Sequence, residues 1–116
     1  MNNLAKYRAW HKEEERMFDV FGFDVNHIYP YTTDEIISPP DWDDVEIMQY
    51  IGIDDIDNKP IYEGDIVDCL RAGDTEWTER VVINDIRSLP RALFGSSLIS
   101  RKVVGNIKEH PYLLKE

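Results

Sequence analysis

Two runs of β-branched and aromatic residues separated by a polar segment dominate the hydrophobic pattern of residues 47–68. The first run is 47–53 (Ile-Met-Gln-Tyr-Ile-Gly-Ile) and the second begins at Ile61, and residues of these types favour strands. Between the runs, residues 54–60 carry Asp, Asn and Pro, which are typical of turns. We therefore predict two strands joined by a tight turn. The second strand is expected to be long, over 61–71, with Gly64 as a further turn signal directly before its buried part.

The pattern of residues 4–23 fits a helix or a pair of strands. Leu4, Tyr7, Trp10 and Met17 roughly follow a helical stripe, and the charged residues 11–16 favour helices. Against this, the Tyr-Arg-Ala part of residues 7–10 alternates between apolar and polar, and residues 17–25 are rich in aromatic and β-branched side chains. We predict strand, turn and strand here, with the helix as the alternative.

The rest of the chain alternates between strand patterns and turn residues. Prolines, glycines and serines predict loops over 26–44 and 89–97, and Gly73 predicts a turn. Strands are expected over 76–86 and 98–108, with Gly105 at a bulge or a close approach, and a helical turn is expected to begin at Pro111. Several short strands with intervening turns predict a mainly β fold, a small antiparallel barrel.

Composition supports one packed domain. The chain has 116 residues, of which 42% are hydrophobic and 31% charged. Its single cysteine, Cys69, lies in an apolar run and cannot form an internal disulfide, so we expect a buried thiol. The sequence shows neither a leader-like apolar segment nor a membrane-spanning run, and we expect a cytoplasmic protein.

The net charge of −10 is concentrated in the middle of the chain. Residues 34–68 contain 12 acidic residues and one basic residue, net −11, whereas the remainder is +1. Such a field repels phosphate backbones and attracts basic partners. The alternative is a solvated acidic face with no partner.

Three segments together resemble the YopX-like proteins of phages and prophages. They are residues 7–10 (Tyr-Arg-Ala-Trp) with the charged run ending at Met17, residues 48–52 with 61–67, and residues 104–107 with the following His-Pro and Leu-Leu pairs. The resemblance implies an SH3-like barrel with extra elements, a single domain over 1–116 and a place in the bacterial host cell. It supplies no activity. The family usually carries Asn-Gly-Lys in the central turn, where this chain has Asp57-Asn58-Lys59, and Asn tolerates the left-handed conformation that such a turn needs. His11 stands where the family usually has Asp.

No motif in the sequence predicts a reaction. A calcium loop beginning at Asp55 would need Gly and Glu where Pro60 and Ile66 stand. The three histidines lack zinc-site spacing, and Ser96-Ser97 lacks the context of a nucleophile elbow. We therefore predict no catalytic set, no metal site and no cofactor.

The candidate site residues form two groups. The first is expected to bind a protein, because a large aromatic among acids suits a basic partner surface; it comprises Trp42, Asp41, Asp43, Asp44, Asp54 and Asp55. The alternative for Trp42 is that it covers the open end of the barrel. The second group carries the family motifs and is expected to be structural, with Arg8 contacting Glu63 or Asp65; it comprises Arg8, Trp10, Tyr62, Glu63, Gly64 and Asp65. Trp10 and Trp77 are expected in the core.

The function that these features favour is that of a non-enzymatic phage or prophage accessory protein. It would bind another protein, a basic host or phage protein, through its acidic central face. The alternative is a nucleic-acid-associated small β-barrel, which would require basic residues to cluster: Arg71, Arg80, Arg87, Arg91, Arg101 and Lys102. An enzyme is a third class, for which we name no residues.

Overall fold

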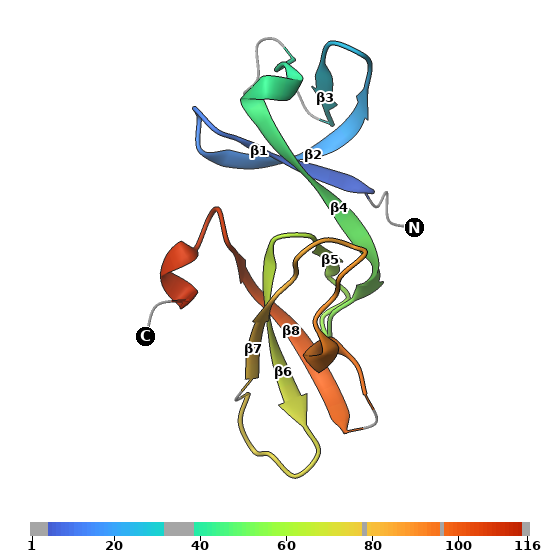
Figure 1. Cartoon of the computed structure of the whole chain (residues 1–116), viewed down its shortest axis with the longest axis vertical. Coiled ribbons are helices and arrows are strands. Elements are labelled where there is room, and N and C mark those ends of the chain that lie inside the picture. Colours follow the sequence, from blue (N-terminus) through green and yellow to red (C-terminus); the bar gives the residue numbers. More distant parts are fainter. Residues whose placement is uncertain (1–4, 32–38, 78, 96, 115–116) are drawn as a thin grey trace. The chain divides into compact units, whose positions relative to one another are not determined.

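The computed structural model describes residues 5–31, 39–77, 79–95 and 97–114, and the chain divides into two compact units (Figure 1). The first unit is Met1–Tyr50 and the second is Ile51–Glu116. The described residues form two antiparallel sheets, of five and three strands, with short 3-10 helices and no α-helix. The predicted mainly β fold is therefore confirmed. No helix in these ranges is long and apolar enough to cross a membrane.

The first unit begins with the predicted strand, turn and strand. β1 (Tyr7–His11) pairs antiparallel with β2 (Arg16–Phe23), and Glu15 closes the turn with a left-handed φ of 53°. The helical alternative for residues 4–23 is wrong over the described residues. β-branched and aromatic residues on β2 gain more from packing in a sheet than the charged 12–15 segment gains from helix propensity.

Three further elements complete the first unit. β3 (Ile28–Pro30) and the 3-10 helix η1 (Trp42–Asp44) lie within the region that was predicted as loop, and β4 (Val45–Asp54) runs on past the end of the unit. The five-stranded sheet has the order β3-β2-β1-β4-β5. Its hydrophobic core in this unit consists of Ala9, Phe18, Val20, Ile28 and Val45.

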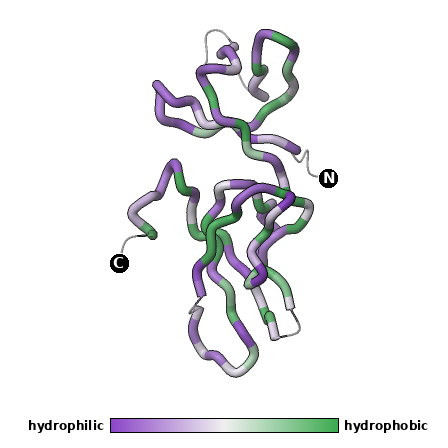
Figure 2. Tube along the Cα trace, viewed as in Figure 1, coloured by the Kyte–Doolittle hydropathy of each residue, from purple (hydrophilic) through white to green (hydrophobic). Residues whose placement is uncertain are grey.

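The second unit contains the three-stranded sheet, ordered β7-β6-β8. Its elements are β5 (Pro60–Tyr62), β6 (Asp65–Arg71), β7 (Glu79–Val82), η2 (Arg91–Leu93), β8 (Leu98–Asn106) and η3 (Pro111–Leu114). β6 is the central strand, and five consecutive residues from Asp65 to Cys69 are buried. Figure 2 shows hydrophobic segments along the strands of both units. Cys69 is fully buried as expected, and burial raises the pKa of its thiol.

The strand predicted over 61–71 is divided in two. Gly64 adopts a positive φ of 87°, its N–H donates to the Ile83 carbonyl at 2.8 Å, and its own carbonyl accepts from Ile107 N–H at 2.9 Å. This turn assigns β5 to the five-stranded sheet and β6 to the three-stranded sheet. The described strands therefore form two sheets and no closed barrel, which corrects the expected SH3-like barrel. The strand predicted over 76–86 is also shorter, because only 79–82 pair with β6.

The predicted turn residues are confirmed. Asn58 has a φ of 63°, so that it fills the left-handed position of the central turn, and Gly73 has a φ of 94°. β8 has a register shift beside Gly105, and a Cβ on Gly105 would lie 2.7 Å from Leu113 Cδ1 and 2.8 Å from His110 Nδ1. Gly105 is thus at both a bulge and a close approach, and Pro111 begins η3.

Candidate protein-binding surface

Large aromatic side chains are exposed on the first unit. Phe21 is 71% exposed, Tyr31 49% and Phe23 48%, although each belongs to or follows a short strand. They pack edge-to-face in pairs, with ring centroids 5.4 Å apart for Phe21 and Tyr31 and 5.8 Å apart for Tyr7 and Phe23. A group of aromatic side chains of this size on one small unit is typical of an interaction surface.

The backbone of β2 explains this exposure. Phe18 and Val20 are buried in the core, as strand alternation requires. The same alternation turns Phe21 and Phe23 to the opposite face of the strand, so both side chains are exposed and lie outside the core cluster. The register between β2 and β3 shifts between Val20 and Gly22, beside these two side chains.

Trp42 joins this group from η1. Its indole Nε1–H donates to the Asp24 carbonyl at 2.9 Å, and its ring lies edge-on to Phe23 with centroids 5.1 Å apart. The ring is 38% exposed. The alternative interpretation, a Trp42 that closes the end of a barrel, is wrong, because the described residues form no barrel. Trp42 is instead held in a fixed orientation on an exposed surface.

The acidic residues around Trp42 are exposed. Asp41, Asp43 and Asp44 all lie at the surface, and the Asp44 carboxylate accepts a hydrogen bond from Asp41 N–H at 3.0 Å. This bond fixes the Asp44 carboxylate against Asp41, and the three aspartates flank Trp42 in the chain. We call this set the aromatic–acidic surface; its residues are Phe21, Phe23, Tyr31, Trp42, Asp24, Asp41, Asp43 and Asp44.

Asp24 organises the turn between β2 and β3. Its Oδ1 accepts from the N–H groups of Asn26 and His27, both at 2.8 Å, and its Oδ2 accepts from the Tyr29 hydroxyl at 2.6 Å. The Tyr29 hydrogen bond is the main cause that lowers the pKa of the Asp24 carboxyl, and it raises the pKa of Tyr29. His27 lies between two carboxylates, with Nε2 3.6 Å from Asp41 Oδ1 and Nδ1 4.0 Å from Asp24 Oδ1.

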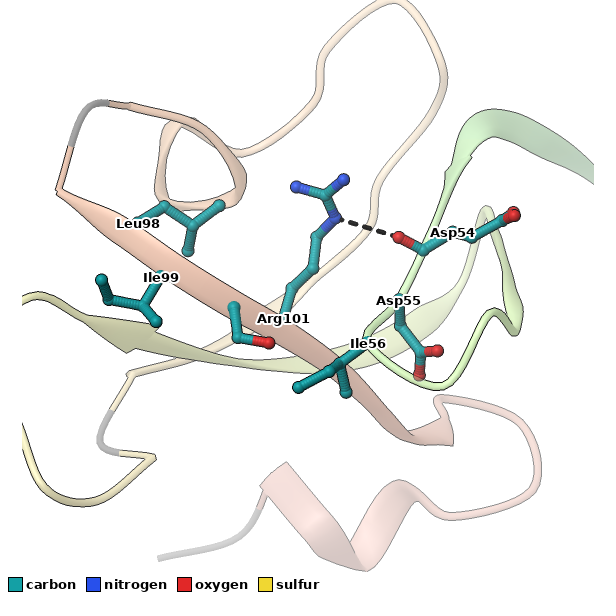
Figure 3. A pocket seen from close by; sticks show the side chains of 7 residues that line it. Asp54, Asp55, Ile56, Leu98, Ile99 and Arg101 are labelled. Carbon is teal, nitrogen blue, oxygen red and sulfur yellow. Dashed lines mark hydrogen bonds between the residues drawn. The ribbon is translucent and has the colours of Figure 1, made fainter.

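The other two predicted binding acids lie in the second unit, beside a hollow between residues 54–56 and β8 (Figure 3). Asp55 is only 6% exposed, and its carboxylate accepts from Asp57 N–H at 2.8 Å, Lys59 N–H at 2.9 Å and Val103 N–H at 2.9 Å. These bonds hold the central turn on β8, which corrects the expectation that Asp55 is available to a partner. Asp54 is exposed, and its carbonyl accepts from Arg101 Nε at 3.2 Å. The Arg101 guanidinium lies beside this hollow and offsets the negative charge of the two aspartates there.

The family-motif residues of the second unit make structural contacts. Asp65 is 1% exposed and accepts from Tyr62 N–H at 2.9 Å and from the Asn106 amide at 3.1 Å. Glu63 accepts from Ile86 N–H at 2.9 Å. These bonds close the turn at Gly64. In the first unit, Arg8 and Trp10 lie on β1. Since Arg8 belongs to one unit and its expected partners to the other, the contact of Arg8 with Glu63 or Asp65 stays a prediction.

Most arginines of the second unit bind acceptors within that unit. Arg80 forms a two-pronged pair with the buried Asp68 at 2.6 and 2.9 Å, which raises the pKa of Arg80. Arg71 donates to Glu79 at 3.1 Å and to the Ala92 and Phe94 carbonyls, and Arg87 lies 3.7 Å from Asp85. Together with Arg101, four of the six basic residues considered for nucleic-acid binding therefore have partners within the unit.

The sequence prediction gave no binding role to Asp24, His27, Tyr29 or Tyr31, which the structure places beside the predicted Trp42 group. The strand pattern over 17–25 was a signal for the exposed Phe21 and Phe23, but it does not include His27, Tyr29 or Tyr31. Among the described residues, no three His, Cys, Asp or Glu side chains are grouped so that they could hold a metal ion.

Comparison with known proteins identifies one family. The model of the family described as YopX protein matches residues 6–115. Among solved structures, the chain is similar to the crystal structure of protein EF1440 from Enterococcus faecalis, with a TM-score of 0.53 and 21% identity, over 95% of this chain and 97% of that one. At that identity the similarity shows the fold alone. The curated proteins include no match.

Proposed function

Because the chain belongs to the YopX family over residues 6–115, we propose that it is a phage or prophage accessory protein that acts by binding a basic protein. The aromatic–acidic surface of the first unit is the proposed contact. The observation that carries the proposal is the half-exposed Trp42, held by Asp24 and Phe23 among three exposed aspartates.

The chemistry of this surface fits a basic partner. The first unit contains eleven acidic and four basic residues, a net charge of −7, against −3 for the second unit with twelve and nine. A concentrated negative field speeds the encounter with a positively charged protein. Aromatic side chains already fixed in position then supply contact area at little cost in conformational entropy.

Binding of nucleic acid is less well supported. A phosphate backbone would be repelled by the first unit, and most arginines of the second unit already satisfy carboxylates or carbonyls. Retention on heparin at moderate salt would be expected of a nucleic-acid-binding protein, and we expect none here.

The test compares two tryptophans of equal exposure. Trp42 and Trp77 are both 38% exposed, but Trp77 lies in the second unit. The prediction that Trp77 belongs to the core is therefore wrong. The wild-type chain is used to capture proteins from a bacterial host lysate, and each captured basic protein is purified and its affinity is measured by calorimetry. We expect Trp42→Ala to weaken binding roughly 30-fold, the loss of about 2 kcal/mol that is typical of an aromatic anchor. Trp77→Ala should leave affinity unchanged.

Two results would contradict the proposal. One is equal affinity of the wild type and Trp42→Ala for the purified partner. The other is capture that disappears when the lysate is treated with nuclease, since that would place nucleic acid, and not protein, on the surface.

A further inference from the structure

Two hollows lie side by side on the aromatic–acidic surface, and their linings differ. The first, of about 300 Å³, is lined mainly by apolar side chains, and we call it the apolar slot: Lys6, Tyr7, Val20, Phe21, Gly22, Phe23 and Tyr31. The second, of about 410 Å³, carries two carboxylates, and we call it the acidic hollow: Val25, Asn26, His27, Asp41, Trp42 and Asp43. Phe23 of the slot and Trp42 of the hollow are in edge-to-face contact at 5.1 Å, so that this ring pair divides them.

Gly22 leaves the apolar slot open. It does not have a positive φ, so an L-residue could adopt its backbone conformation, and a Cβ added there would meet nothing within 4 Å. Neither a positive φ nor internal packing therefore requires glycine at this position. Glycine within a strand marks a bulge, and the register does shift beside Gly22, or a place where another molecule approaches closely, which fits a residue that lines a slot.

We propose that the two hollows form a bipartite site for an extended segment of the basic partner. An aliphatic side chain of that segment enters the apolar slot, and a neighbouring Lys or Arg side chain enters the acidic hollow. This inference rests on the proposed function and adds to it the kind of sequence that is recognised.

The charges of the two hollows indicate which partner side chain enters each of them. Asp41 and Asp43 line the acidic hollow and attract a cation, whereas Lys6 also lines the apolar slot and would repel one. The aromatic walls of the slot favour an uncharged aliphatic group through burial of apolar area. A second copy of this chain is a poor occupant, because two first units would each bring a net charge of −7.

The test uses three acetylated and amidated peptides as probes: Lys-Lys-Leu-Leu-Lys-Lys, Lys-Lys-Ala-Ala-Lys-Lys and Gln-Gln-Leu-Leu-Gln-Gln. The first peptide presents Leu and Lys at several spacings, and the other two each lack one feature. Affinities are measured by NMR titration of the full chain, following the aromatic signals of the slot. We expect the Leu–Lys peptide to bind about fivefold more tightly than the Ala–Lys peptide.

Two variants separate the hollows. Gly22→Leu fills the slot and should abolish the difference between the affinities of the Leu–Lys and Ala–Lys peptides, because neither a Leu nor an Ala side chain can then enter it. Gly22→Ala is the control for folding. Its thermal unfolding should match that of the wild type, which would show that position 22 tolerates a side chain. The double variant Asp41→Asn with Asp43→Asn should bind both Lys-containing peptides about threefold more weakly. Its affinity for the Gln–Leu peptide should equal that of the wild type.

The outcomes distinguish this inference from the proposed function. Equal binding of the Leu–Lys and Ala–Lys peptides to the wild type would overturn the bipartite site, while the preference for basic peptides would still support a basic partner. Equal binding of the Leu–Lys and Gln–Leu peptides would overturn both.

Discussion

The aspartates that surround Trp42 in the chain and the aspartates that are buried lie in different units. In the first unit Asp41, Asp43 and Asp44 stand at the surface around Trp42. In the second, Asp55, Asp65 and Asp68 are buried and bind backbone N–H groups, an amide or an arginine. The same residue type therefore builds a candidate interface in one unit and supports the backbone in the other. A run of acids in a sequence is not by itself an acidic face.

The sharpest way to test this difference is to remove one aspartate from each unit. Asp65→Ala would remove a buried carboxylate that accepts hydrogen bonds from the Tyr62 N–H and the Asn106 amide, and we expect a loss of about 3 kcal/mol in the free energy of unfolding. Asp43→Ala, at the surface, should change it by less than about 0.5 kcal/mol. Denaturant titration of both variants measures the two effects, and similar losses would show that the contrast between the units is wrong.

A pair of glycines sharpens the comparison further. Gly105→Ala would force its Cβ against Leu113 and His110, and His110 Nδ1 accepts a hydrogen bond from Asn106 N–H at 3.2 Å. We expect destabilisation of about 1–3 kcal/mol, since overpacking displaces η3 from β8. Gly22→Ala in the first unit meets nothing and should have no such cost. The melting temperatures of the two variants measure this difference. An unchanged melting temperature for Gly105→Ala would contradict the close packing of η3 against β8.

The smallest expected effect concerns pH and the first unit. The pKa of Asp24 is lowered below its usual 3.8, chiefly by the Tyr29 hydroxyl. A depressed carboxyl pKa in the folded state contributes stability that is complete above the usual value and is lost as pH falls through the folded-state value. Asp24→Asn should therefore show a weaker decline in unfolding free energy between about pH 6 and about pH 3 than the wild type. Identical declines, measured by denaturant titration, would show that Asp24 does not stabilise this turn through its charge.

Much of the local structure was predictable, because it depends on neighbouring residues. The β-branched and aromatic runs predicted the hairpin of β1 and β2, and the Asn58, Gly73 and Pro111 signals predicted turns and η3. The site was predicted in part: Trp42 and its aspartates were named, whereas Asp24 and Tyr31 were not. Their roles depend on how the turn between β2 and β3 folds and on how β3 lies against β2, and residue types alone do not specify that geometry.

Local conformation could thus be inferred from residue types, since steric limits on φ and strand propensity act within a few positions. Which acids are buried was decided by contacts between distant segments: Asp65 with Asn106, Asp55 with Val103, and Asp68 with Arg80. The division of residues 61–71 between two sheets has the same origin, because Gly64 exchanges hydrogen bonds with Ile83 and Ile107. A carboxylate is stable out of water only where such partners meet it, and only the folded chain brings those partners together.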